Sequence, residues 1–135
     1  MGIVKTDIKQ KTIKEEISLT GVGLHTGKDV TLTFKPSASN SGFSFKRVDL
    51  EGEPLIEADA NYVTNTQRGT CLEKNGVTIQ TSEHVLAALV GLGIDNAVIE
   101  LNAAEPPIMD GSSKFFVEAI EKAGVVELDA FREEF

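Results

Sequence analysis

The chain has 135 residues, of which 41% are hydrophobic and 25% are charged, a balance typical of one globular domain with a sizeable core. Its formal charge of −8 disfavours a sequence-independent nucleic-acid binder, because such proteins need a cationic face. An anionic substrate stays compatible with this charge if basic residues such as Lys46 and Arg47 gather locally. One tyrosine and no tryptophan also disfavour a base-stacking platform.

The cellular location is inferred from the lack of membrane-spanning and signal-peptide patterns in the sequence. No apolar stretch is long enough to cross a bilayer, and the lysine-rich segment 1–14 has no apolar core of the kind that a signal peptide needs. A single cysteine, Cys71, excludes an internal disulfide framework. These features predict a cytoplasmic protein without a transmembrane segment.

The first half of the chain carries the alternating hydrophobic pattern of β-strands. This alternation predicts strands over Thr12–Thr20 and Asp29–Lys35. Shorter strands are expected around Phe43–Val48 and over Leu55–Ala60, Thr70–Glu73 and Val77–Gln80. The last two should pair as a hairpin, because Asn75-Gly76 between them is a strong two-residue turn signal.

The hydrophobic period then becomes helical. Ser82–Leu92 is expected to form a mostly buried helix that Thr81 or Ser82 caps. After a valine- and isoleucine-rich strand, Ala97–Leu101, and a turn-forming connection over 105–111, a second helix is predicted over Lys114–Ala123. Ser112 or Ser113 would cap this helix, and Gly124 would close it.

The order of these elements predicts an α+β fold. Strands followed by helices suggest a two-layer sandwich, in which two helices pack on one face of a mixed or antiparallel sheet. Residues 1–126 are expected to form this domain. The tail, 127–135, holds four acidic residues and one arginine, and it is predicted to be a linker that adds no closing element.

The chain has two histidines, and the pair Glu83-His84 falls at the start of the first predicted helix. Side chains of a first turn can reach one site beyond the helix end, where the backbone N–H groups favour anions and a neutral imidazole. A neutral imidazole binds metal and an ionised carboxylate can act as a base, so the pair is compatible with metal-assisted hydrolysis. Glutamate is also common in first turns for dipole reasons alone, and the local pattern by itself favours such a structural role.

Two further residues are weighed as ligands. His25 lies in a glycine-rich loop, 21–27, that leads into a strand and so fails as a dinucleotide-binding motif; His25 is either solvated or a ligand contact. Cys71 is expected to be a small buried hydrophobe. A catalytic zinc needs three protein ligands, so either His25, Cys71 and an acid complete a set with His84, or the remaining ligands lie on another segment.

Four motifs occur in order along the chain. They are Gly21-Val-Gly-Leu-His-Thr-Gly27, Thr81-Ser-Glu-His-Val-Leu-Ala-Ala-Leu89, Gly91-Leu-Gly-Ile-Asp-Asn96 and Pro107-Ile-Met-Asp-Gly-Ser112. Together they resemble the UDP-3-O-acyl-N-acetylglucosamine deacetylase family, the zinc enzymes of lipid A biosynthesis, over about residues 11–124. In some bacteria this deacetylase is fused to an acyl-carrier-protein dehydratase.

The resemblance implies an enzyme of two similar α+β domains, of the ribosomal S5 domain 2-like type, with the active site between them. This chain would be the first domain, with 127–135 leading to a second domain that it lacks. Glu83 would be the general base and His84 a ligand of Zn²⁺. The other two ligands, from a His-Lys-x-x-Asp stretch, would lie in the second domain, so the zinc site is incomplete here.

The resemblance also implies residues near the substrate. His25 would lie near the metal, and Thr66, Gln67, Arg68 and Gly69 would belong to an insert that flanks the substrate, although Gln67-Arg68-Gly69 is more polar than the family's version. The implied reaction hydrolyses the 2-acetamido group of a UDP-linked acylated glucosamine, and the fragment alone would be inactive. The alternative is a non-catalytic module of this fold that binds a sugar nucleotide or a protein partner; a downstream His-Lys-x-x-Asp stretch would favour the enzyme.

Overall fold

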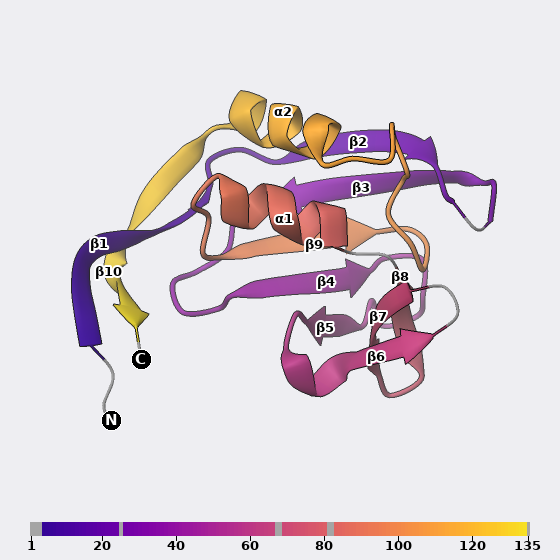
Figure 1. Ribbon diagram of the computed structural model, residues 1–135, viewed down its shortest axis with the longest axis horizontal. Helices are drawn as coiled ribbons and strands as arrows, with labels where there is room; N and C mark the ends of the chain where they lie inside the picture. Colours follow the sequence, from indigo (N-terminus) through magenta and orange to yellow (C-terminus); the bar gives the residue numbers. More distant parts are fainter. Residues whose placement is uncertain (1–3, 25, 67–68, 81–82, 135) are drawn as a thin grey trace.

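The centre of the molecule is a five-stranded mixed sheet. The computed structural model describes residues 4–24, 26–66, 69–80 and 83–134. Strand order is β2-β3-β9-β4-β5 (Figure 1). The strands are β2 (Ile17–Val22), β3 (Asp29–Lys35), β4 (Phe43–Arg47), β5 (Leu55–Glu57) and β9 (Ala97–Leu101). β4 runs parallel to β9, and the other neighbouring strands are antiparallel.

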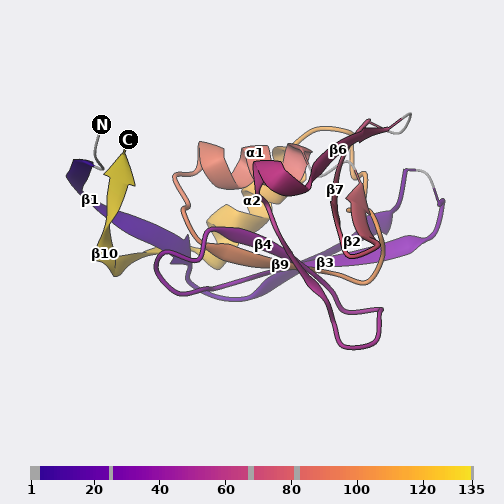
Figure 2. The ribbon, with the colours of Figure 1, turned by 90° about the horizontal axis from the view of Figure 1, so that it is seen from below.

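Two helices cover one face of this sheet. α1 (Glu83–Gly91) and α2 (Lys114–Ala123) lie on the same side of β3, β4 and β9 (Figure 2). Phe116 of α2 packs edge to face against Phe34 of β3, with 6.4 Å between ring centroids, and Leu89 of α1 is fully buried in the same core. The predicted α+β architecture with both helices on one face is therefore confirmed.

A three-stranded antiparallel sheet follows β5 along the chain. It contains β6 (Val63–Thr66), β7 (Gly69–Lys74) and β8 (Val77–Gln80), after a short 3₁₀ turn over Ala60–Tyr62. Asn75 and Gly76 join β7 to β8 with φ angles of 52° and 81°, the paired positive values that a type I′ hairpin turn requires. The predicted hairpin is confirmed, and Cys71 is buried in β7 as expected.

The two ends of the chain form a separate antiparallel ribbon of β1 (Val4–Ile13) and β10 (Val125–Glu134), which brings the termini side by side (Figure 1). The linker predicted over 127–135 is thus wrong for residues up to Glu134, which belong to a paired strand. The strand predicted over Thr12–Thr20 is also wrong, because the chain leaves the ribbon at 14–16 before it enters the central sheet.

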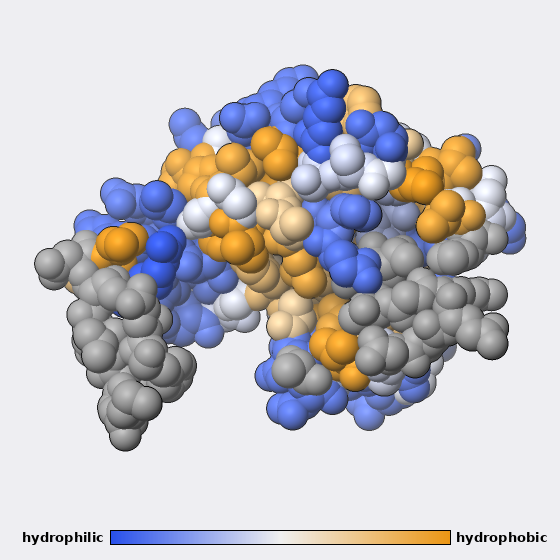
Figure 3. All heavy atoms as spheres, viewed as in Figure 1, coloured by the Kyte–Doolittle hydropathy of each residue, from blue (hydrophilic) through white to orange (hydrophobic). Residues whose placement is uncertain are grey.

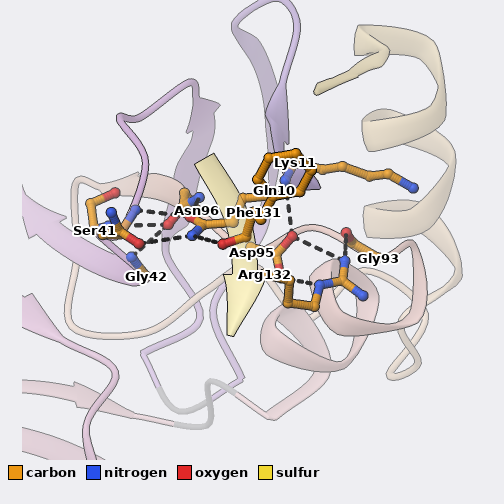
Figure 4. Close-up of polar contacts among 10 residues, drawn as sticks. Gln10, Lys11, Ser41, Gly42, Gly93, Asp95, Asn96, Phe131 and Arg132 are labelled. Atoms are coloured by element: carbon orange, nitrogen blue, oxygen red, sulfur yellow. Dashed lines mark hydrogen bonds and ion pairs between the residues drawn. The ribbon is translucent and has the colours of Figure 1, made fainter. Parts of the chain in front are cut away.

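Buried polar side chains fasten the ribbon to the core (Figure 4). Asn96 donates from its Nδ2 to Gln10 Oε1 over 2.9 Å, and Gln10 Nε2 donates to the carbonyl of Phe131 over 3.0 Å. Arg132 forms a two-pronged ion pair with Asp95, at 2.9 Å and 3.0 Å. Both strands of the ribbon are therefore held against the loop that precedes β9.

Local hydrogen bonds are made at both ends of α2, although its N-cap residue, Ser113, makes no side-chain capping bond. Ser112 Oγ accepts a hydrogen bond from the Lys114 backbone N–H over 3.2 Å, and Gly124, with φ at 87°, donates from its N–H to the Ile120 carbonyl over 2.9 Å. The bounds predicted for this helix are confirmed. The capping residues predicted for α1, Thr81 and Ser82, lie outside the described residues. No helix in the described part of the chain is long and apolar enough to span a membrane.

Candidate active site

A cavity of about 160 Å³ lies where the first turn of α1 meets two connections. The first connection joins β2 to β3, and the second leads from β9 to α2. The lining residues are Leu24 from the first connection, Glu83, His84 and Val85 from α1, Pro106, Pro107, Ile108 and Gly111 from the second connection, and Phe116 from α2. The cavity therefore combines one carboxylate and one imidazole with mostly apolar walls.

Glu83 and His84 are the first two residues of α1, and both side chains are exposed. Consecutive helical residues diverge along most of a helix, but at this helix end both line the same cavity. The backbone N–H groups of a first turn lack partners within the helix and favour negative charge nearby. The arrangement thus offers an accessible carboxylate base beside an accessible imidazole ligand.

The second connection is fastened to the first by backbone contacts. Gly23 and Pro107 form an antiparallel β-bridge, and the Ile108 N–H donates to the Val22 carbonyl over 2.8 Å. Further along, hydrogen bonds from the Ser112 hydroxyl and backbone N–H hold the pKa of Asp110 below its ordinary value. These contacts give the cavity a defined wall beside α1.

Glu105 is a buried carboxylate that the sequence did not single out. Its side chain is 1% exposed, and Oε1 accepts hydrogen bonds from the Thr26 backbone N–H at 3.1 Å and the Thr26 hydroxyl at 3.2 Å. The segment Glu105-Pro-Pro107 resembles an exposed turn in composition, and no local pattern marks a glutamate there as buried. Contact with a residue 79 positions away explains its burial.

The other predicted site residues are only partly described. Thr66 and Gly69 face each other across the β6–β7 pairing, while His25, Gln67 and Arg68 lie outside the described residues. Within the described ranges, no group of three or more His, Cys, Asp or Glu side chains is arranged to hold a metal ion.

Lys46 and Arg47, which the sequence offered as binders of an anionic substrate, each form an ion pair with a nearby acidic residue. Arg47 is nearly buried and forms a two-pronged ion pair with Asp49, at 2.9 Å and 2.8 Å. It also donates to the carbonyl of Thr78 over 3.0 Å. Lys46 lies 3.4 Å from a carboxylate oxygen of Glu53. Both cations thus serve local structure around β4.

Hydrophobic surface lies over the helical layer (Figure 3). On α1, Val90 exposes 64% of its surface, and Leu24 at the rim of the cavity exposes 55%. The apolar exposed surface thus belongs to α1 and the rim of the cavity, whereas the exposed residues of α2 are the charged Lys114, Glu118, Glu121 and Lys122.

Comparison with known proteins finds a matching family and relatives that are named deacetylases. The sequence profile described as UDP-3-O-acyl N-acetylglycosamine deacetylase matches residues 10–135. The bifunctional enzyme LpxC/FabZ of Bacteroides thetaiotaomicron is 52% identical over 126 residues, which are 93% of this chain and 27% of that protein. UDP-3-O-acyl-N-acetylglucosamine deacetylases of Psychrobacter sp. and Methylococcus capsulatus are 50% and 52% identical over 89% and 91% of the chain, and the match covers 40% of each. The chain therefore spans well under half the length of these relatives.

Proposed function

Because the chain belongs to the UDP-3-O-acyl-N-acetylglucosamine deacetylase family, we propose that it is the N-terminal domain of a zinc-dependent amidohydrolase. The whole enzyme would remove the N-acetyl group from UDP-3-O-acyl-N-acetylglucosamine in lipid A biosynthesis, in the cytoplasm. The observation that carries the proposal is the shared position of Glu83 and His84 in one cavity at the start of α1.

The residues present suit part of a zinc site. Zinc in proteins accepts imidazole nitrogen and carboxylate oxygen, and a catalytic site uses three protein ligands with one position open. His84 offers an exposed imidazole in the cavity, and we assign the remaining ligands to the part of the enzyme beyond this chain. Zinc bound there would polarise the substrate carbonyl and favour ionisation of water.

Glu83 would act as the general base and then as the general acid. Its carboxylate would accept one proton from the attacking water and donate it to the departing nitrogen, so that water adds across the amide C–N bond and yields acetate and a free amine. The adjacent Val85 and Ile108 give the cavity apolar walls against which the acetyl methyl group can pack.

The exposed apolar side chains over the helical layer support a second domain in the same enzyme. Exposed apolar surface is typical of an interface, and Figure 3 shows such surface over α1, on which Val90 is 64% exposed. A chain that covers 27% to 40% of its relatives leaves ample sequence for that domain. Pairing along the helices would bring further residues toward the open cavity beside His84.

The test uses the full-length protein that contains this chain. Glu83→Gln keeps the shape of the side chain but cannot accept the water's proton, so acetate release should fall by about 10²–10⁴-fold while zinc content by atomic emission stays unchanged. His84→Ala should instead lower zinc content. Glu121→Gln, the same change at an exposed position of α2, is the matched control and should retain activity.

Two results would contradict the proposal. Near-normal turnover of Glu83→Gln at full zinc content would remove the assigned base. A full-length wild-type protein that binds the UDP-linked substrate without releasing acetate would favour the alternative, a binding module of the same fold.

A further inference from the structure

The carboxylate of Glu105 is buried just outside the cavity. Glu105 is 1% exposed, and burying a carboxylate is costly unless hydrogen bonds replace its water. Oε1 receives two such bonds from one residue, Thr26, through the backbone N–H at 3.1 Å and the hydroxyl at 3.2 Å. These two bonds link segments that lie 79 residues apart in the sequence.

Gly23 shows how closely the two segments approach. A Cβ atom added at this position would collide with Oε1 of Glu105 and would lie 2.7 Å from the hydroxyl oxygen of Thr26. The turn around it is closed by backbone bonds, from the Gly27 N–H to the Gly23 carbonyl at 3.0 Å and from the Gly23 N–H to the Lys28 carbonyl at 2.9 Å. A side chain at residue 23 would therefore force the Glu105 carboxylate and the Thr26 hydroxyl to move.

The linked segments are walls of the cavity that holds Glu83 and His84. Leu24 belongs to the turn that Thr26 anchors, and Pro106 and Pro107 follow Glu105 directly; all three line the cavity. Glu105 itself is not among the lining residues, so it affects the cavity through the neighbouring residues that line it.

We propose that Glu105 is a positioning residue, whose buried carboxylate holds the 23–27 turn against the connection that precedes α2 and so fixes the Leu24 wall of the substrate cavity. The proposal rests on the proposed function, because it assigns the cavity to the substrate. Since Glu83 and His84 are carried by α1, which this link does not hold, loss of the link should weaken substrate binding more than it slows the chemical step.

The test compares threonine variants in the full-length protein. Thr26→Val removes the hydroxyl that donates to Glu105 and keeps the side-chain size, whereas Thr26→Ser keeps the hydroxyl. Thr20→Val is the matched control, because Thr20 is exposed and its hydroxyl pairs with the Thr31 hydroxyl on the neighbouring strand, at 3.1 Å and away from the cavity lining. We expect KM to rise roughly 10-fold in Thr26→Val with kcat within about 3-fold of wild type, and both constants to stay near wild type in Thr26→Ser and Thr20→Val.

The glutamate is tested directly by two variants. Glu105→Ala removes both bonds from Thr26, and Glu105→Gln keeps an oxygen acceptor, so KM should be highest in Glu105→Ala and intermediate in Glu105→Gln. Hydrogen exchange of the peptide that covers residues 22–28 is the second readout. Its amides should exchange roughly 10-fold faster in Glu105→Ala and in Thr26→Val, because hydrogen bonds that hold the turn to Glu105 are lost. If Glu105→Ala fails to fold, KM and the exchange rates of the Thr26 and Glu105→Gln variants test the proposal.

Different experimental results would contradict this proposal and the proposed function. If wild-type enzyme releases acetate while folded Thr26→Val and Glu105→Gln keep wild-type KM and wild-type exchange, Glu105 does not position the turn. A loss of kcat at unchanged KM would also overturn the assignment, because Glu105 would then act on the chemical step. If wild-type protein releases no acetate, the proposed function fails, and the exchange rates alone decide whether Glu105 holds the turn.

Discussion

Truncation of the Asn96 side chain should lower the free energy of unfolding by more than truncation of an exposed asparagine. The amide of Asn96 is 1% exposed and joins three segments (Figure 4). Oδ1 accepts from the backbone N–H groups of Ser41 at 3.1 Å and Gly42 at 2.9 Å, and Nδ2 donates to Gln10 Oε1 at 2.9 Å. Asn96→Ala removes all three bonds and leaves two backbone donors without this acceptor.

The magnitude follows from the bonds that are lost. Each hydrogen bond contributes about 1 kcal/mol net, and a buried donor left without its acceptor costs about 1–3 kcal/mol. Because water can reach part of the vacated space and solvate the two donors, we count the three lost bonds alone and expect a loss of about 3 kcal/mol. With an unfolding entropy of roughly 2 cal/mol/K per residue, this loss corresponds to a fall in Tm of about 10 °C.

Thermal and guanidinium unfolding of the isolated chain, followed by circular dichroism, measures this loss. Asn102→Ala is the matched control, because Asn102 Oδ1 accepts from the Thr31 N–H over 2.9 Å but its side chain is exposed. Water can replace that acceptor, so the control should lose less than about 1 kcal/mol. If both variants lost the same free energy of unfolding, the argument from burial would be refuted.

Four further outcomes are expected. The hydrogen bonds from Arg47 hold the pKa of Asp49 below its ordinary value, so this stabilisation is complete above about pH 4 and is lost as pH falls through the folded-state pKa; Asp49→Asn should flatten the acid side of the unfolding profile in urea. Phe116→Ala should cost about 3–5 kcal/mol in the same assay, and Phe115→Ala, at a half-buried neighbour, less than half of that. The isolated chain should bind zinc weakly in competition with a chelating dye, because His84 is the one ligand we take from it; tight one-to-one binding would contradict this assignment. The isolated chain should also release no measurable acetate from the UDP-linked substrate.

The elements that sequence predicted well are those whose ends are marked locally. The serine pair 112–113 and Gly124 flank the second helix: Ser112 accepts from the first helical N–H, and Gly124 makes the closing bond that its residue type favours. Asn75-Gly76 defines its hairpin in the same way, because both residues tolerate the positive φ that the turn needs. A few neighbouring residues suffice for such predictions.

The errors at the ends of the chain have two different causes. Ile13 and Ile17 lie an even number of residues apart, so the alternation continues in phase across the break at 14–16 and does not reveal it. In the C-terminal strand, Val126 and Leu128 are half-buried while Glu127 between them is exposed, so the strand pattern was present. The acidic composition of the tail obscured it.

The residues of the candidate site also differ in whether the local sequence predicts them. Glu83 and His84 were found because they are adjacent in the sequence and stand at a helix start that periodicity reveals. Glu105 was missed because its partner Thr26 lies 79 residues away, and no local pattern tells a buried glutamate from an exposed one.

Long-range polar contacts hold both the ribbon and the cavity wall, and this explains why they escape local analysis. Gln10 bonds to Asn96 across 86 residues and to the Phe131 carbonyl across 121. Such bonds join segments whose own residues, read locally, indicate only loop or strand. Hydrophobic alternation therefore predicts which elements form and which face they bury, whereas a few buried polar side chains determine how the connections between them are placed. Because Leu24 and residues 106–108 and 111 of the cavity lining come from connections and not from helices or strands, we expect the shape of that part of the cavity to depend on residues such as Glu105.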